Sequence, residues 1–264
     1  MPAEFERTFD NAAREYEATR PEYPPALYGA LLRYQPLSPQ SRVLEIGLGT
    51  GKAAGPVLQT GCQFIGLEPG GNLAALAAQR LRGFANFRLS QTTLQDFCCP
   101  DASLDLVYAA TAFHWLPEEY AYRRVYDLLR PGGAFARFAY RAGPDKKRLA
   151  LTEEVDGYYQ QALSQKGKYR ELQEEDIQAR AALAERYGFT QTAWHLYHMQ
   201  KDFTAQEYMA LLRTYRDHMA LDPASRQRLF EGIYSAIQRH GGVMTVYYTV
   251  DLELARKPAA PAAR

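Results

Sequence analysis

One short stretch of the sequence brings residue types and spacing that suit close contact with a ligand. In VLEIGLGTGK, residues 43–52, Glu45 ends an apolar run and Gly47, Gly49 and Gly51 follow at every second position. Glycine lets the backbone turn tightly and approach a bound molecule, because it has no Cβ. We therefore expect a ligand-binding loop at 47–51, with Gly51 opening the helix that follows.

Two common glycine-rich loops do not fit this stretch. A phosphate-binding P-loop needs Ser or Thr after its lysine, but Ala53 follows Lys52. The dinucleotide fingerprint G-x-G-x-x-G needs Gly or Ala at position 52, which is Lys52. An acid followed by three alternating glycines remains.

Two further side chains could do chemistry near this loop. Glu68 ends a second apolar run about twenty residues after the glycines, a spacing at which a carboxylate can bind a ribose. His114, in AFHW, can change protonation near neutral pH and is our first candidate for a general base. The pair in HLYH, His195 and His198, does not predict a metal site, because strand residues three apart point to opposite faces.

These residues must be positioned by the elements around them. Short apolar runs at 42–48, 62–68, 84–90, 104–110 and 133–140 read as strands, and helix-like segments at 72–82 and 117–129 lie between them. Strands and helices in alternation predict a parallel, doubly wound sheet with both faces covered. Ligands bind such sheets beyond the carboxyl ends of the strands, where the loop, Glu68 and His114 all fall.

The second half of the chain is read as the completion of this sheet plus a cover. Residues 189–204 and 241–257 look like strands, 205–221 and 223–240 like amphipathic helices, and 141–188 is charged and helical. We expect about seven strands in one domain, residues 42–256, with helical insertions near 141–188 and 204–241. Residues 1–41 form a helical lead-in or flap, and 257–264 a disordered tail.

Composition excludes several classes of protein. The 264 residues carry a net charge of +1, so the chain lacks the excess of basic residues that is typical of nucleic-acid-binding proteins. The sequence shows neither a membrane-length apolar run nor a secretory signal, and its three cysteines form no metal pattern. We expect a cytoplasmic protein without nucleic-acid or membrane partners or a bound metal. The sequence leaves open whether it is a monomer or a homodimer.

In order and spacing, residues 42–140 resemble the class I S-adenosylmethionine-dependent methyltransferases, whose first motif has the form acid-x-Gly-x-Gly-x-Gly. The lead-in FDNAAREYEATRPEYPPALYGALL is similar to that of the type 11 group, which includes the trans-aconitate methyltransferases. The resemblance implies a Rossmann-like sheet and S-adenosyl-L-methionine as cofactor, with S-adenosyl-L-homocysteine as product. In such proteins the lead-in packs over the cofactor.

The resemblance also implies roles for individual residues. Glu68 would hold the ribose, the 47–51 loop would lie against the methionyl part, and Glu45 would fix that loop or reach the amino group through water. The remaining expected cofactor contacts are Pro69, Thr93 and Leu94 with the adenine, Ala109 and Ala110 through their carbonyls, and Arg20 near the carboxylate. Many relatives have an aspartate where Thr93 stands, so a weaker or backbone contact to the adenine amino group is expected.

For the acceptor, His114 and Tyr140 are the catalytic candidates, although a histidine beside aromatics can equally be structural. The candidates for acceptor contact are Tyr16, Tyr23, Trp115, Arg141, Arg213, Tyr215 and Arg216. A sulfonium has a good leaving group already, so no universal catalytic dyad is required. We expect methyl transfer to a small molecule, with carboxylic acids as one candidate class. The alternative is a catalytically silent protein that keeps the fold and binds cofactor or partner.

Overall fold

The computed structural model describes residues 13–163 and 170–259, and its centre is one sheet of seven strands. The spatial order is β3-β2-β1-β4-β5-β7-β6. The strands are β1 (Arg42–Ile46), β2 (Gln63–Leu67), β3 (Phe87–Ser90), β4 (Leu104–Ala110), β5 (Leu129–Gly143), β6 (Thr190–Thr204) and β7 (Val243–Arg256). The first five are parallel to one another, whereas β7 runs antiparallel to both β5 and β6. The predicted seven-stranded, Rossmann-like sheet is confirmed.

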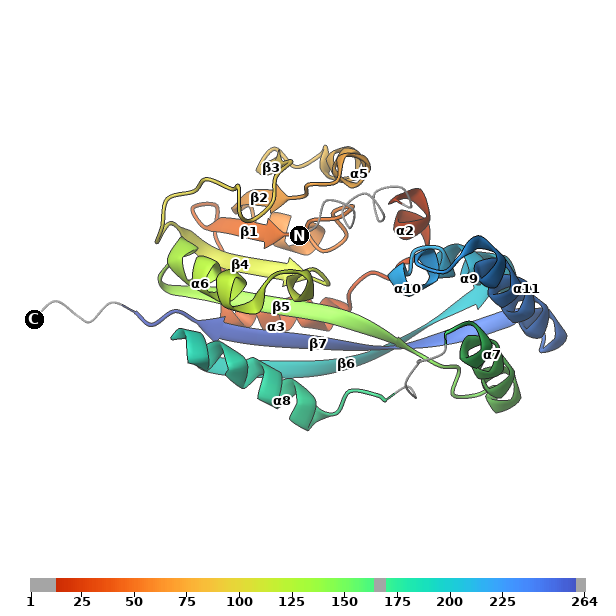
Figure 1. Ribbon diagram of the computed structural model, residues 1–264. Coiled ribbons are helices and arrows are strands. Elements are labelled where there is room, and N and C mark those ends of the chain that lie inside the picture. The colour runs from red at the N-terminus through yellow and green to blue at the C-terminus, as the bar shows by residue number, and fades with distance from the viewer. Residues whose placement is uncertain (1–12, 164–169, 260–264) are drawn as a thin grey trace, which may run out of the picture.

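Helices cover both faces of this sheet, with α3 behind it and α6 and α8 in front in the view of Figure 1. The helices are α2 (Ala13–Thr19), α3 (Pro25–Tyr34), α4 (Gly55–Leu58), α5 (Gly71–Leu81), α6 (Glu118–Leu128), α7 (Leu149–Ala162), α8 (Glu174–Ala182), α9 (Ala205–Leu212), α10 (Arg216–Met219) and α11 (Pro223–Arg239), with 3-10 turns η1 (Phe113–Trp115) and η2 (Leu183–Tyr187). Because both faces are covered, β1 and β4 are almost wholly buried, which explains their unbroken apolar runs.

The helices α9, α10 and α11, here called the cover, are inserted between β6 and β7. The ends of β5, β6 and β7 extend beyond β1 to β4 and carry the cover together with α7 (Figure 1). Ile233 and Ile237 of α11 and Leu211 of α9 are fully buried and belong to the same apolar cluster as Tyr108 of β4. The cover is thus packed into the main core.

Three predicted element boundaries were wrong. Gly51 does not open a helix: it has a left-handed φ of +80°, and α4 begins only at Gly55 with Pro56 in its first turn. The single helix predicted over 205–221 is broken at Tyr215, whose backbone is extended, and the Thr214 hydroxyl donates to the Leu211 carbonyl at 2.6 Å just before the break.

The third boundary is that of the expected tail, because residue 257 is anchored to the rest of the chain. The Lys257 ammonium donates to the carbonyls of Tyr126 and Leu129 at 2.7 and 2.8 Å. Residues 260–264 of that tail, and residues 1–12 of the predicted lead-in, lie outside the described residues. None of the helices among residues 13–163 and 170–259 is long and apolar enough to cross a membrane.

Candidate active site

The glycine loop joins β1 to α4 at the carboxyl end of the sheet. Gly47 and Gly49 both have positive φ, +69° and +59°, a conformation that other residues rarely adopt. A Cβ on Gly47 would lie 2.5 Å from the Cβ of Ala112, which follows β4. The loop therefore needs glycine at 47 both for its backbone angle and for its contact with the turn after β4.

Glu68 fastens this loop from the end of β2. One of its carboxylate oxygens accepts a hydrogen bond from the Gly49 amide and the other from the Gly70 amide, each at 2.8 Å. The residue is only 6% exposed, yet it lines the main cavity. The two hydrogen bonds therefore hold the Glu68 carboxylate at the wall of the cavity.

A cavity of about 320 Å³ opens beyond the carboxyl ends of the parallel strands. Most of the predicted site residues line it: Tyr16, Arg20, Gly47, Gly49, Glu68, Pro69, Thr93, Leu94, Ala110, His114, Trp115, Tyr215 and Arg216. The wall near Glu68 is otherwise largely apolar, with Leu67, Leu73 and Leu94 beside it. Such a wall fits a purine ring beside a ribose diol, so the residues present fit S-adenosylmethionine.

The opposite wall comes from the lead-in and the cover. Arg20 donates to the Thr214 carbonyl at 2.9 Å and to its hydroxyl at 3.0 Å. Its guanidinium also lies over the rings of Tyr215, Tyr16 and Tyr140, at 4.4, 5.3 and 5.9 Å from their centroids. This arginine therefore ties the lead-in to the cover across the mouth of the cavity.

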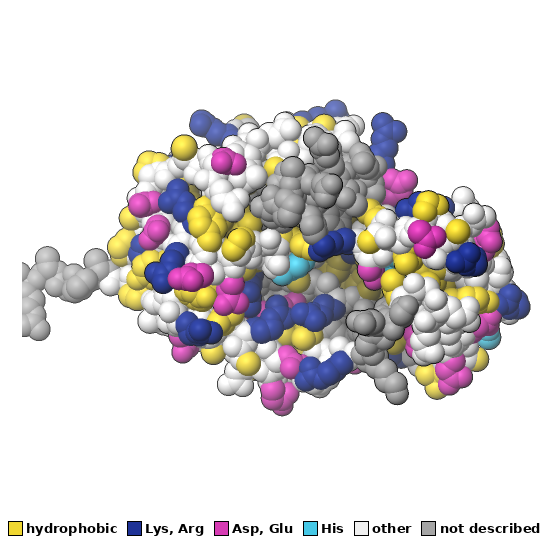
Figure 2. All heavy atoms as spheres, viewed as in Figure 1, with side chains coloured by type: hydrophobic (Ala, Val, Ile, Leu, Met, Phe, Trp, Pro, Cys, Tyr) yellow, Lys and Arg dark blue, Asp and Glu magenta, His cyan; other side chains and the backbone are white. Residues whose placement is uncertain are grey.

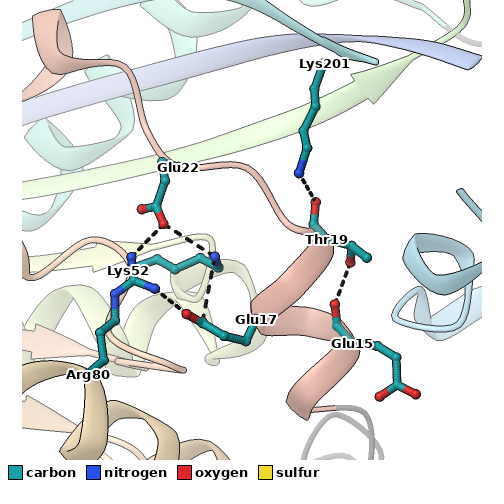
Figure 3. Close-up of polar contacts among 7 residues, drawn as sticks. All are labelled: Glu15, Glu17, Thr19, Glu22, Lys52, Arg80 and Lys201. Atoms are coloured by element: carbon teal, nitrogen blue, oxygen red, sulfur yellow. Dashed lines mark hydrogen bonds and ion pairs between the residues drawn. The ribbon is translucent and has the colours of Figure 1, made fainter. Parts of the chain in front are cut away.

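A second set of contacts holds the lead-in to α5, to the glycine loop and to β6, as Figure 3 shows. Glu17 and Glu22 form ion pairs with Arg80 of α5 and with Lys52 of the glycine loop; the Lys52 distances are 3.7 and 3.4 Å. On the other side, the Lys201 ammonium donates to the Thr19 carbonyl at 3.1 Å. The lead-in thus spans both sides of the cavity.

His114 lies in η1 at the rim of the cavity, with its ring 4.7 Å from that of Trp115. Partial burial and the positive charges of Arg141 and Arg180 lower its pKa. The guanidinium of Arg216 lies over the Trp115 ring at 5.3 Å. On the face shown in Figure 2, Lys and Arg side chains gather over the strands between α6 and α10, beside this rim.

Seven predicted site residues do not line the main cavity. Glu45, Tyr23 and Tyr140 line a small adjoining cavity instead, and the Tyr23 and Thr111 hydroxyls form a hydrogen bond at 2.6 Å. Gly51 faces Leu81 of α5, and a Cβ there would lie 2.9 Å from its Cδ1. The other three also lie elsewhere: Ala109 buried within β4, and Arg141 and Arg213 on exposed surface. These seven lie outside the main cavity, and contact of any predicted residue with a ligand stays a prediction.

The structure adds lining residues that the sequence reading missed: Ile46, Leu67, Leu73, Thr92, Gln95, Thr111, Ala112, Leu116 and Asp217. Most are neighbours of predicted residues at the strand ends, where position alone could have indicated them. Asp217 had no such signal, because an acid in a charged helical segment is usually solvated. No group of three or more metal-ligating side chains occurs among the residues that the structure describes.

Comparison with known proteins agrees with this geometry. Residues 43–133 match a family described as a methyltransferase domain. An uncharacterised methyltransferase of Mycobacterium tuberculosis is 31% identical over 131 residues, which is 48% of this chain and 49% of that protein. The trans-aconitate 2-methyltransferase of Deinococcus radiodurans is 31% identical over 102 residues, 38% of each chain.

Solved structures with the same fold include the YcgJ protein of Bacillus subtilis, at a TM-score of 0.54 and 18% identity, covering 89% of this chain and 99% of that one. Phosphoethanolamine N-methyltransferase 2 of Haemonchus contortus, solved with S-adenosyl-L-methionine, has a TM-score of 0.52 and 19% identity, with 94% and 57% covered. The predicted class I resemblance is confirmed. The chain spans about half the length of these curated relatives.

Proposed function

We propose that this chain, whose residues 43–133 match a methyltransferase domain, transfers a methyl group from S-adenosylmethionine to a small-molecule acceptor. The observation that carries the proposal is the position of Glu68. Its buried carboxylate closes the glycine loop through Gly49 and still borders the cavity at the end of β2. That is where an adenosine ribose is bound in doubly wound sheets.

The residues of the chain would divide the work between two walls. Glu68, the 47–49 loop, Pro69, Thr93 and Leu94 would hold the cofactor, which supplies an electrophilic methyl group on a sulfonium. The opposite wall would hold the acceptor in line and exclude water, which is the main catalytic requirement of direct transfer. Tyr16, Trp115 and Tyr215 line the cavity, and aromatic rings favour a nearby cation.

A small carboxylic acid is the acceptor class that we favour. Arg20 and Arg216 line the acceptor wall, and the Arg216 guanidinium lies over the Trp115 ring at 5.3 Å from its centroid. Arginine binds carboxylates through two parallel hydrogen bonds. The trans-aconitate 2-methyltransferase among the relatives acts, by its name, on such an acid.

The test is calorimetric titration with S-adenosylmethionine and S-adenosylhomocysteine of the unaltered chain, Glu68→Ala and Glu231→Gln. Glu231 is an exposed acid on α11, outside the cavity, and serves as the matched control. Loss of charged hydrogen bonds in Glu68→Ala should weaken binding about 100-fold, while Glu231→Gln should bind normally. Absence of binding to the folded, unaltered chain would refute the proposal.

Consumption of the cofactor distinguishes an active methyltransferase from the catalytically silent alternative. A chain that binds S-adenosylmethionine but forms no S-adenosylhomocysteine with any of a panel of small carboxylic acids would favour the silent alternative. Cytoplasmic location, the absence of nucleic-acid and membrane partners, and a monomeric or dimeric state stay predictions.

A further inference from the structure

The part of the lead-in that borders the cavity, residues 13–24, is held on its two sides by contacts of different kinds. It consists of α2 and the extended stretch before α3, and it contributes Tyr16 and Arg20 to the cavity wall. Contacts to α5 and the glycine loop lie on one side, and the contact to Lys201 of β6 lies on the other (Figure 3). The way in which each side is held decides along which border this wall can part.

On the side of the cover and β6, the contacts are largely buried. Thr214 is fully buried and accepts two hydrogen bonds from the Arg20 guanidinium, which also lies over the Tyr215 ring. Thr19 is buried as well, and its carbonyl accepts a hydrogen bond from the Lys201 ammonium at 3.1 Å. Hydrogen bonds from charged donors are stronger than neutral ones, and they are costly to leave unmade when buried. This side is therefore the firmer attachment.

On the side of α5 and the glycine loop, the lead-in is held by four charged side chains, here called the ion cluster: Glu17, Glu22, Lys52 and Arg80 (Figure 3). Arg80 forms ion pairs with Glu17 and, at 2.6 Å, with Glu22. Lys52 lies 3.7 and 3.4 Å from the same two carboxylates. Within the described part of the chain, every ion pair of these four side chains is made inside the cluster.

The two attachments differ in how they respond to salt. The side chains of Glu17, Glu22 and Arg80 are 31%, 56% and 32% exposed. Ion pairs between such partly exposed groups contribute little to stability, and dissolved salt screens them. A guanidinium that is buried and hydrogen-bonded, such as that of Arg20, is screened much less. The border between the lead-in and the glycine loop with α5 is therefore the one that parts first.

The ion cluster lies beside the wall that we assign to the cofactor. Arg80 belongs to α5, which also brings Leu73 to the cavity wall near Glu68. Lys52 directly follows the loop that the Glu68 carboxylate holds through Gly49. An opening along the ion cluster would therefore expose the cofactor part of the cavity.

We propose that the ion cluster is a latch for the methyl donor: S-adenosylmethionine enters and S-adenosylhomocysteine leaves where the lead-in parts from α5 and the glycine loop. This inference rests on the proposed function. The lead-in stays attached to the cover during this opening, because Arg20 and Thr214 remain bonded. The lifetime of the S-adenosylhomocysteine complex then depends on the ion cluster.

The experiment measures how fast radiolabelled S-adenosylhomocysteine dissociates when it is chased with unlabelled ligand. Glu22→Gln and Arg80→Gln should each speed dissociation about 3- to 10-fold, because ion pairs that hold the border closed are lost. The double variant should show less than the product of the two single effects, since both changes remove the same ion pair. Glu119→Gln removes an exposed ion pair with Arg123 on α6 and should dissociate like the unaltered chain.

Salt provides a second readout. An increase from about 50 mM to about 500 mM sodium chloride should speed dissociation from the unaltered chain severalfold, because the ion pairs are screened. The same increase should have a smaller effect on Arg80→Gln, which lacks the arginine that pairs with both glutamates.

A third readout needs no ligand. Backbone amide hydrogen exchange in residues 13–24 should be faster in Arg80→Gln than in the unaltered chain, while exchange in α11 stays the same. A parallel increase in α11 would mean general destabilisation and would overturn the latch.

The outcomes separate the latch from the proposed function. Failure of the folded, unaltered chain to bind S-adenosylhomocysteine refutes the proposed function, and the latch with it. Normal binding with unchanged dissociation rates in Glu22→Gln and Arg80→Gln overturns the latch alone. So does a dissociation rate that responds to salt equally in the unaltered chain and in Arg80→Gln.

Discussion

The buried carboxyl of Glu45 gives the sharpest prediction for stability. Glu45 is the next-to-last residue of β1 and is 1% exposed, and its Oε2 accepts a hydrogen bond from the Tyr108 hydroxyl at 2.7 Å. Its Oε1 is buried and has no hydrogen-bond partner among the described residues. Burial raises the pKa of this carboxyl to about 8, although the Tyr108 hydrogen bond opposes the rise.

The sign of the pH effect follows from these protonation states. When the chain is unfolded, Glu45 loses its proton near its ordinary value of 4.5, but in the folded chain it keeps the proton up to about pH 8. Between these values the folded state holds one proton more, so the free energy of unfolding falls as the pH rises. Each pH unit in this window costs about 1.4 kcal/mol, or about 3 kcal/mol between about pH 5 and about pH 7.5.

The perturbation is Glu45→Gln, which has similar shape and cannot ionise. Its free energy of unfolding, minus that of the unaltered chain, should rise by about 3 kcal/mol across that range, because the penalty in the unaltered chain is removed. Urea unfolding of both proteins at several pH values measures this difference. Titratable groups that both proteins share contribute equally to the two free energies of unfolding, so their pH dependence cancels in the difference. Glu231→Gln, at an exposed site, should give a flat difference. A flat difference for Glu45→Gln would refute the reasoning.

Three further predictions follow from packing and contacts. Gly47→Ala should destabilise the fold by about 1–3 kcal/mol through its positive φ and its contact with Ala112, and Ala112→Gly should recover only the contact part, as thermal unfolding would show. Arg20→Lys should weaken S-adenosylhomocysteine binding severalfold in calorimetry, because lysine cannot bond Thr214 twice and stack on tyrosines; unchanged affinity would exclude a role of Arg20 in closing the cavity. Ile233→Ala, fully buried in α11, should cost about 2–5 kcal/mol in urea unfolding, and a smaller loss would mean that the cover is loosely packed.

The cofactor wall was predictable because it is local in sequence. The loop at 47–49 and Glu68 follow directly from consecutive strand ends, and strand order alone brings them together. The start of the first helix after the loop was predicted wrongly because it depends on backbone angles. Gly51 has a left-handed conformation, so α4 begins only at Gly55. The expected role of Glu45 stays a prediction: its carboxylate accepts a hydrogen bond from Tyr108 inside the sheet, and the residue also lines the small adjoining cavity.

The acceptor wall could not be read in the same way. It joins Arg20, Trp115 and Asp217, which are far apart in the chain and meet only through tertiary packing. Arg213 and Arg216 look equivalent in the sequence, but the helix is interrupted at Tyr215, so Arg213 is exposed whereas Arg216 reaches Trp115. No periodicity distinguishes them in advance.

The insertion of the cover between β6 and β7 has a consequence for how such a protein can change its substrate. Residues 205–242 leave the sheet at one strand end and return at the neighbouring one, since Thr204 pairs with Val243. The segment is therefore an insertion whose two ends lie side by side. Its sequence can diverge, or it can be exchanged for a segment of different length, while the strands that bind the methyl donor keep their register. The family match ends at residue 133, well before this insertion. Chimaeras that graft the loop between the last two strands of a relative onto this sheet would exchange the acceptor preference while keeping the donor.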